Sequence, residues 1–100
     1  MTPEGKVKKL CTDLLKKYKA HYFMPVSNGM GRAGVSDIIG CFQGKYFVIE
    51  VKSATGKPTP LQLKFIQEVK DADGKAFIVN GAEALKEVEG WLKEVTNERI

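Results

Sequence analysis

The sequence predicts a small α/β protein of the α+β kind, in which helices flank one mixed sheet. Three observations support this prediction. Apolar residues recur at helical spacing in three segments, short runs of strand-forming residues lie between those segments, and glycine, proline or asparagine marks the joints. The expected order is helix, three strands, helix, strand and helix, which suits a sheet covered by helices. With 100 residues and no repeat or linker, we expect a single domain over residues 1–100.

The first expected elements are a helix over residues 3–19 and a short strand over residues 21–26. Thr2 and Pro3 match the residue preferences of a helix N-cap and first turn. The apolar positions that follow are three or four residues apart: Val7, Leu10, Cys11, Leu14, Leu15 and Tyr18. The next run is rich in strand-forming residues, and SNG at positions 27–29 ends it.

A hairpin is expected next, followed by a helix, a strand and a last helix. Residues 35–42 and 45–52 are predicted strands, and Gln43-Gly44 is the turn between them. After a loop, Thr59-Pro60 opens a helix that ends near Asp73-Gly74, and a strand covers residues 75–79. The apolar positions of the two helices are Leu61, Phe65, Ile66 and Val69 in the first, and Leu85, Val88, Trp91, Leu92 and Val95 in the last.

Composition and charge narrow the class of protein. The chain is 43% hydrophobic and 28% charged, with no apolar run near the ~20 residues that a membrane span needs and no secretory signal. We therefore expect a cytoplasmic protein with reduced thiols at Cys11 and Cys41, a single disulfide being the alternative. The net charge is +4, and six lysines lie within residues 1–20. Such a segment favours a phosphate backbone as partner; a solvated lysine-rich helix face is the equal alternative.

The hairpin brings ionisable side chains together at one end. If Gln43-Gly44 forms the loop, the pairing continues along both strands until Asp37 faces Glu50. Lys52 shares that face, because side chains alternate along a strand. A glycine bulge in the turn would instead place Asp37 diagonal to Glu50.

Two opposed carboxylates repel each other, so an apolar hairpin needs a reason to carry them. A divalent cation between Asp37 and Glu50 supplies one, because oxygen ligands suit Mg²⁺ or Mn²⁺. Such an ion acidifies a bound water and offsets charge on a phosphorus atom. Lys52 would orient or deprotonate the attacking water, or stabilise the transition state. The alternative is a surface salt bridge in which Lys52 only neutralises one of the acids.

The same residues carry a resemblance to a nuclease family. Asp37, followed by IEVK at 49–52, looks like the PD…(D/E)xK nuclease signature. Together with GVSDIIG at 34–40 and PLQ at 60–62, the pattern resembles the virus-type replication–repair nuclease (VRR-NUC) domain over nearly the whole chain. The departure is Ser36, where the signature most often has proline. The resemblance implies a restriction-endonuclease-like fold of αβββαβ order, which agrees with the elements expected above.

The resemblance also implies roles for single residues. Asp37, Glu50 and the Val51 carbonyl would bind Mg²⁺ or Mn²⁺, and Lys52 would be catalytic. Glu4 in the first helix would reach the metal site, and Gln62 would support it.

Both of these last two residues have plain alternatives. An acid in the first turn of a helix, such as Glu4, is favoured by the helix dipole, although its spacing from Val7 and Cys11 points it towards the core. Gln62 lies three residues after Thr59, which is the pattern of a capping box.

Phosphate contacts are expected from Arg32, Lys57, Lys6 and Lys9, with an ordinary surface position as the alternative for the lysines. Arg32 belongs to GMGRAG at 29–34, which matches the spacing of a dinucleotide-binding fingerprint. We reject that interpretation, because the fingerprint needs a helix after the loop and a strand-like run follows here. The glycines suit the approach of a nucleic acid or form a plain connection.

These expectations describe a metal-dependent, structure-selective DNA endonuclease. Stand-alone members of this size in the family look like viral or bacterial dimers that cut four-way junctions. We therefore expect a homodimer that resolves Holliday junctions, since a symmetric pair presents two sites. The alternatives are a monomeric flap nuclease and a DNA-binding module of the same fold without catalysis. His21 and Trp91 are expected to be structural, and apolar residues left exposed near Trp91 would form a dimer face.

Overall fold

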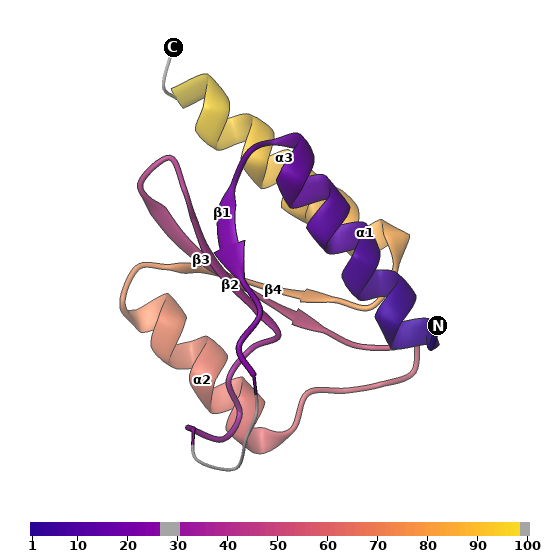
Figure 1. Ribbon diagram of the computed structural model, residues 1–100. Coiled ribbons are helices and arrows are strands. Elements are labelled where there is room, and N and C mark those ends of the chain that lie inside the picture. Colours follow the sequence, from indigo (N-terminus) through magenta and orange to yellow (C-terminus); the bar gives the residue numbers. More distant parts are fainter. Residues whose placement is uncertain (27–30, 99–100) are drawn as a thin grey trace.

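The computed structural model describes residues 1–26 and 31–98 (Figure 1). The elements are α1 (Pro3–Lys17), β1 (His21–Phe23), β2 (Ile38–Phe42), β3 (Lys45–Val51), α2 (Pro60–Asp71), β4 (Lys75–Val79) and α3 (Ala82–Glu98). This order confirms the predicted α+β fold with its C-terminal helix. None of the described helices is long and apolar enough to cross a membrane.

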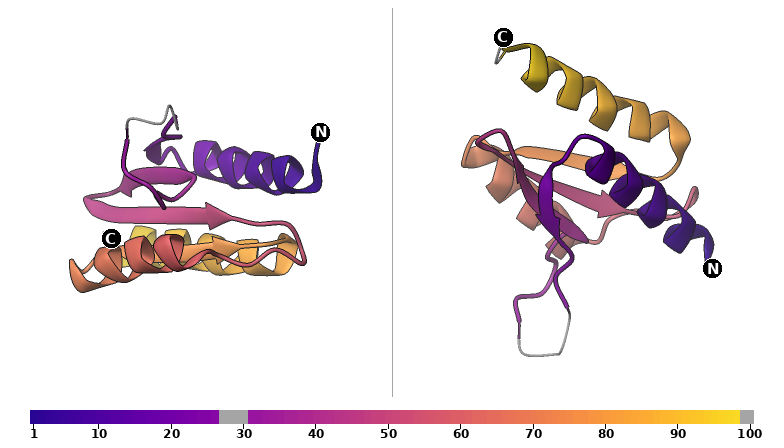
Figure 2. Two further views of the ribbon diagram at one scale, coloured as in Figure 1. Left: turned by 90° about the horizontal axis from the view of Figure 1, so that it is seen from below. Right: turned by 45° about the horizontal axis from the view of Figure 1, so that its top comes forward.

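The four strands form one mixed sheet in the order β1-β2-β3-β4. β1 pairs with β2, and β2 with β3, in antiparallel orientation. β3 and β4 are parallel and are joined through α2. Figure 2 shows α1 and α3 side by side in its right view, and β2 and β3 between α1 and α2 in its left view. The sheet therefore separates α2 from the pair of helices α1 and α3.

The hairpin turn has the tight form that the register prediction required. Gln43 and Gly44 have φ angles of 49° and 84°, and positive φ at both central residues is typical of a two-residue turn that matches strand twist. Phe42 consequently pairs with Lys45, and the register runs without a bulge to Ile38 opposite Ile49. One residue further on, Asp37 comes opposite Glu50.

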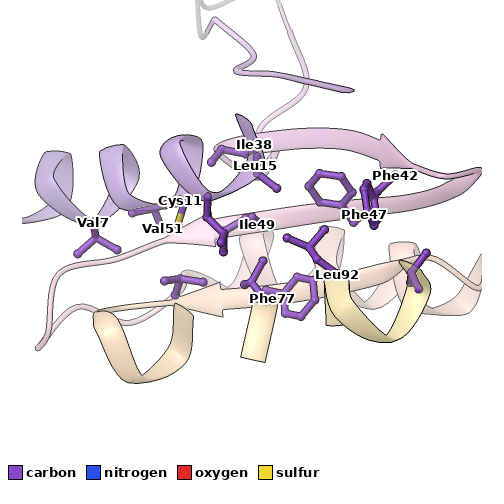
Figure 3. Close-up of a cluster of buried hydrophobic side chains, with 14 residues drawn as sticks. Val7, Cys11, Leu15, Ile38, Phe42, Phe47, Ile49, Val51, Phe77 and Leu92 are labelled. Atoms are coloured by element: carbon purple, nitrogen blue, oxygen red, sulfur yellow. The ribbon is translucent and has the colours of Figure 1, made fainter. Parts of the chain in front are cut away.

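Side chains alternate between two cores on either side of the sheet. Phe47, Ile49 and Val51 of β3 belong to the larger core, which α1 and α3 cover (Figure 3). Val48 belongs to a smaller cluster with Phe65 and Val69 of α2. Trp91 is partly buried and packs against the larger core, where its ring lies 5.6 to 6.2 Å from three phenylalanine rings, so its structural role is as expected.

Two predicted strands were too long. The predicted strand 35–42 begins only at Ile38, because the chain before it bends at Gly34 (φ 80°), which packs against the backbone of Leu61. β1 ends at Phe23 rather than at residue 26, since its partner β2 offers no strand beyond Ile38 and Pro25 has no N–H to donate. The predicted SNG terminator, residues 27–29, lies outside the described residues.

The remaining differences are small. α1 ends two residues earlier than predicted, where Lys19 takes a positive φ of 61°. Both cysteines are free thiols: Cys11 of α1 is buried, and Cys41 of β2 is exposed. His21 is an exposed residue of β1 and pairs with Cys41 in the ladder.

Candidate active site

The candidate site lies at the open end of the hairpin, away from the turn. Asp37 immediately precedes β2, Glu50 is the last residue but one of β3, and Lys52 follows that strand. Glu50 lies two residues after Val48 and therefore points to the α2 side of the sheet. The structure brings the carboxyl groups of Asp37 and Glu50 into contact, as the register predicted.

Asp37 is fixed in place by the backbone of β3. Its Oδ2 accepts a hydrogen bond of 2.8 Å from the Val51 N–H, so the side chain replaces the next rung of the β2–β3 ladder. The N–H and C=O of one strand residue point to the same side of the strand. The Val51 carbonyl is therefore directed towards Asp37. This geometry gathers two carboxylates and one backbone carbonyl at a single place.

Glu50 is an acid buried without adequate partners. Its side chain is 1% exposed, and its Oε1 has no hydrogen-bond partner among the described residues. Burial, as the largest cause, and the neighbouring Asp37 together raise the pKa of Glu50 from 4.5 to about 8, against the opposing effect of Lys52. A buried polar atom without a partner is costly, which indicates that the site is built to receive something.

Lys52 is the third predicted residue of this cluster. Its Nζ lies 3.6 Å from Glu50 Oε2, and its side chain is only 15% exposed. The alternative of a surface salt bridge does not describe this pair, because Glu50 is fully enclosed. An ammonium group held beside two acids can donate hydrogen bonds to a water or a phosphate oxygen at the site.

The sequence analysis missed Lys8, which approaches the site from α1. Its Nζ lies 3.6 Å from Asp37 Oδ1. Cys11, one turn further along the same helix, also lies near Asp37: burial raises the pKa of its thiol to about 12, and the Asp37 charge contributes. The sequence carries no signal that would have singled out Lys8 among the lysines of α1, because its contact with Asp37 depends on how α1 packs.

Ser36 is a second residue whose part the sequence did not reveal. It is 1% exposed, and its Oγ has no hydrogen-bond partner within residues 1–26 and 31–98. A pocket of about 540 Å³ opens here, and its described walls are residues 31–37, Pro25, Val26 and Gln62. An unpartnered hydroxyl and an acid therefore line the same hollow.

Glu4 and Gln62 are placed differently from each other. Glu4 is exposed in the first turn of α1, one turn before Lys8, and makes no ion pair with any described residue. It is therefore not buried in the core, although Val7 and Cys11 at helical spacing from it are. Gln62 completes the predicted capping box: its Oε1 accepts a 2.9 Å hydrogen bond from the Thr59 N–H, and its own N–H donates a 3.2 Å bond to Thr59 Oγ1. Gln62 also lines the pocket.

The four residues expected to contact phosphate come from three parts of the chain: Lys6 and Lys9 from α1, Arg32 from the segment before β2 and Lys57 from the segment before α2. Arg32 pairs with Glu68 and stacks 5.1 Å above the ring of Phe65, so α2 holds it in place. Lys9 forms a 2.9 Å ion pair with Asp13 on its own helix. Lys6 and Lys57 are exposed. Lys6 and Lys57 are therefore accessible at the surface, whereas Arg32 and Lys9 are held in ion pairs within the protein.

The residues of the site fit a divalent cation. Within the described chain no group of three or more His, Cys, Asp or Glu side chains could hold a metal, so the protein offers two carboxylates and the Val51 carbonyl. Such a sparse set of hard oxygen ligands suits Mg²⁺ or Mn²⁺, which keep several waters and accept substrate phosphate oxygens. The unpartnered Glu50 Oε1 is the atom that such an ion would satisfy.

Comparison with known families agrees with this geometry. The model of the VRR-NUC domain family matches residues 2–83, more than four-fifths of the chain. The chain belongs to the VRR-NUC family. A search of curated proteins found no match. VRR-NUC domains are nucleases of the PD-(D/E)xK type, so the protein is a nuclease domain with DNA as its substrate class. Asp37, Glu50 and Lys52 all lie within the matched residues.

The VRR-NUC match ends near the start of α3. That helix nevertheless completes the fold, since Val88, Leu92 and Val95 are buried in the larger core. Tyr18 at the end of α1 also donates a 2.9 Å hydrogen bond to Glu89 of α3. The last helix therefore helps to hold α1, and with it Lys8, against the nuclease site.

Proposed function

We propose that the protein is a metal-dependent, structure-selective DNA endonuclease that hydrolyses phosphodiester bonds with Mg²⁺ or Mn²⁺ and resolves four-way junctions as a homodimer. The observation that carries the proposal is the buried Glu50 carboxyl, which has one unpartnered oxygen and lies against both Asp37 and Lys52. A merely structural acid would not be placed where it lacks a partner, because replacing it with an apolar residue would stabilise the fold.

Each side chain has a distinct part in hydrolysis. When bound, a divalent cation would acidify a water molecule and offset the negative charge that develops on the phosphoryl group. Asp37 and Glu50 hold that ion; Asp37 is already oriented by the Val51 N–H, so little reorganisation is needed. Lys52 orients the attacking water and donates hydrogen bonds to the phosphate oxygens as their charge grows.

The homodimer is supported by apolar side chains at the edge of the sheet. β1 is an edge strand, and around its end Phe23, Met24 and Val26 are 55%, 46% and 84% exposed. Exposed apolar side chains gathered beside an open strand edge favour contact with another protein surface. Val26 also lines the pocket beside Asp37, so a second copy at this edge would set two sites near each other. This cluster, rather than a face around the partly buried Trp91, is the dimer surface that we propose.

Cleavage of labelled DNA tests the proposal. Four-way junction, flap and linear duplex of equal length are incubated with the protein in Mg²⁺, in Mn²⁺ and in chelator. We expect the junction to be cut fastest, by paired symmetric incisions, and chelator to abolish cutting. Preferential cutting of the flap would favour the monomeric alternative, and binding without cutting in either metal would favour the non-catalytic module.

The oligomeric state is tested separately by sedimentation velocity over a concentration series. We expect a dimer at micromolar concentration, and Val26→Asp together with Phe23→Asp should shift it to monomer. The matched control is Leu10→Asp, because Leu10 is a similarly exposed apolar residue (45%) on α1. A wild-type protein that stays monomeric throughout the series contradicts the homodimer.

A further inference from the structure

A second ammonium group, that of Lys8, reaches the candidate site from α1. Its Nζ lies 3.6 Å from Asp37 Oδ1, and the side chain is 38% exposed. Val7 and Cys11 of the same helix are buried, whereas the Lys8 side chain remains partly accessible to solvent. The nuclease signature assigns no part to this residue.

The two oxygens of Asp37 have separate partners. Oδ2 accepts the Val51 N–H, whereas Oδ1 faces Lys8. A cation bound between Asp37 and Glu50 would take up oxygen lone pairs on these carboxylates and would repel a nearby ammonium group. Lys8 and the metal ion therefore compete for Asp37, whereas the Val51 hydrogen bond remains.

The charges of the site indicate what Lys8 does once it is released. With a divalent cation bound, two carboxylates and Lys52 leave the site with a net charge of one positive unit, and Lys8 brings it to two. A phosphodiester carries one negative charge, and attack by hydroxide gives a transition state with two. The site matches the charge of that transition state only when Lys8 is counted.

We propose that Lys8 is a phosphate-binding residue of the nuclease site, held by Asp37 in the metal-free protein and released to bind the DNA phosphate when a divalent cation occupies the carboxylates. This inference rests on the proposed function, because it requires the same metal site. It has two consequences of opposite sign. Removing the ammonium group strengthens metal binding, since a competitor is lost, and weakens DNA binding, since a phosphate contact is lost.

Lys8→Gln tests both consequences without measuring cleavage. Calorimetric titration with Mn²⁺ in the absence of DNA should give a Kd about fivefold lower than that of wild type. Binding of the four-way junction in Ca²⁺, which replaces the catalytic metal, should give a Kd about three- to tenfold higher, and the slope of log K against log salt should become shallower by about 0.9. Lys8→Arg should restore DNA binding, because arginine keeps the charge.

The matched control is Lys16→Gln, which removes the same charge from the same helix. Lys16 is exposed and makes no ion pair with any residue of the described segments. We expect the affinities of Lys16→Gln for Mn²⁺ and for the four-way junction to stay within about twofold of wild type, since a lysine at an exposed position contributes only long-range charge. Thermal unfolding of all variants shows that they are folded.

The outcomes separate this inference from the proposed function. If Lys8→Gln weakens Mn²⁺ and DNA binding together, Lys8 has only a structural part and the inference is wrong; unchanged DNA affinity also overturns it. If wild type binds Mn²⁺ and cuts DNA while Lys8→Gln equals it in both affinities, only the assignment of Lys8 fails. If wild type binds no Mn²⁺, the proposed function fails as well.

Discussion

Replacing the buried acid Glu50 by glutamine should stabilise the metal-free protein at alkaline pH. The carboxyl is 1% exposed, and its pKa is raised from 4.5 to about 8. Because one pKa unit corresponds to about 1.4 kcal/mol, ionising Glu50 in the folded protein costs about 4 to 5 kcal/mol. Glutamine has nearly the same shape but never ionises, so Glu50→Gln avoids this cost.

The sign of the pH dependence follows from linkage. The folded pKa of Glu50 lies above the unfolded value, so the stabilisation from its neutral form is fully present below pH 4.5 and is lost as the pH rises through about 8. The free energy of unfolding of wild type should therefore fall from pH 5 to pH 9. The advantage of Glu50→Gln over wild type should grow by about 4 kcal/mol across that range.

Urea unfolding followed by circular dichroism, with chelator present, measures this difference at pH 5, 7 and 9. The control is Glu87→Gln on α3, because Glu87 is exposed and its variant should show no such growth. A stability difference between Glu50→Gln and wild type that stays constant with pH would refute the reasoning.

Three further predictions concern other parts of the molecule. Mn²⁺ binding to wild type should tighten from pH 6 to 8, by up to about tenfold per pH unit, because the ion displaces the Glu50 proton. Calorimetry measures this change, and a Kd for Mn²⁺ that does not vary with pH contradicts the prediction. Cys41 should react with a thiol reagent at least about 100-fold faster than buried Cys11, whose pKa is about 12; equal rates of labelling count against the burial. Gly40→Ala should be strongly destabilising, because the new Cβ would overlap the His21 carbonyl oxygen. Gly90→Ala has nothing within 4 Å of its new Cβ and should raise the free energy of unfolding by about 0.5–1 kcal/mol. Similar melting temperatures for the two variants would contradict this prediction.

Local chemistry explains why much of the fold could be predicted from the sequence. The two-residue turn at Gln43-Gly44 fixes the hairpin register, and the register alone places Asp37 opposite Glu50. The capping box of Thr59 and Gln62 depends on residues only three positions apart. In each case the interacting groups are close in the chain or are linked by a short turn.

The features that the sequence did not reveal depend on distant parts of the chain. Lys8 meets Asp37 only because α1 packs across the end of the hairpin, and no spacing rule within a helix gives that position. Arg32 pairs with Glu68, which is 36 residues away, so the sequence alone indicates a phosphate contact where the structure has an ion pair. β2 begins three residues later than the sequence predicts, because the chain before it bends at Gly34 and packs there against the backbone of Leu61, which is distant in the sequence.

The central claim is that Asp37, Glu50 and Lys52 form one metal-dependent hydrolytic site, and single-turnover cleavage of a four-way junction tests it most directly. Asp37→Asn keeps an acceptor for the Val51 N–H, and Lys52→Gln keeps most of the side-chain volume, so both variants should remain folded. We predict that each loses at least about 1,000-fold in the rate of cleavage in Mn²⁺, equivalent to about 4 kcal/mol. A folded variant of either kind that cuts within about tenfold of the wild-type rate would contradict the account.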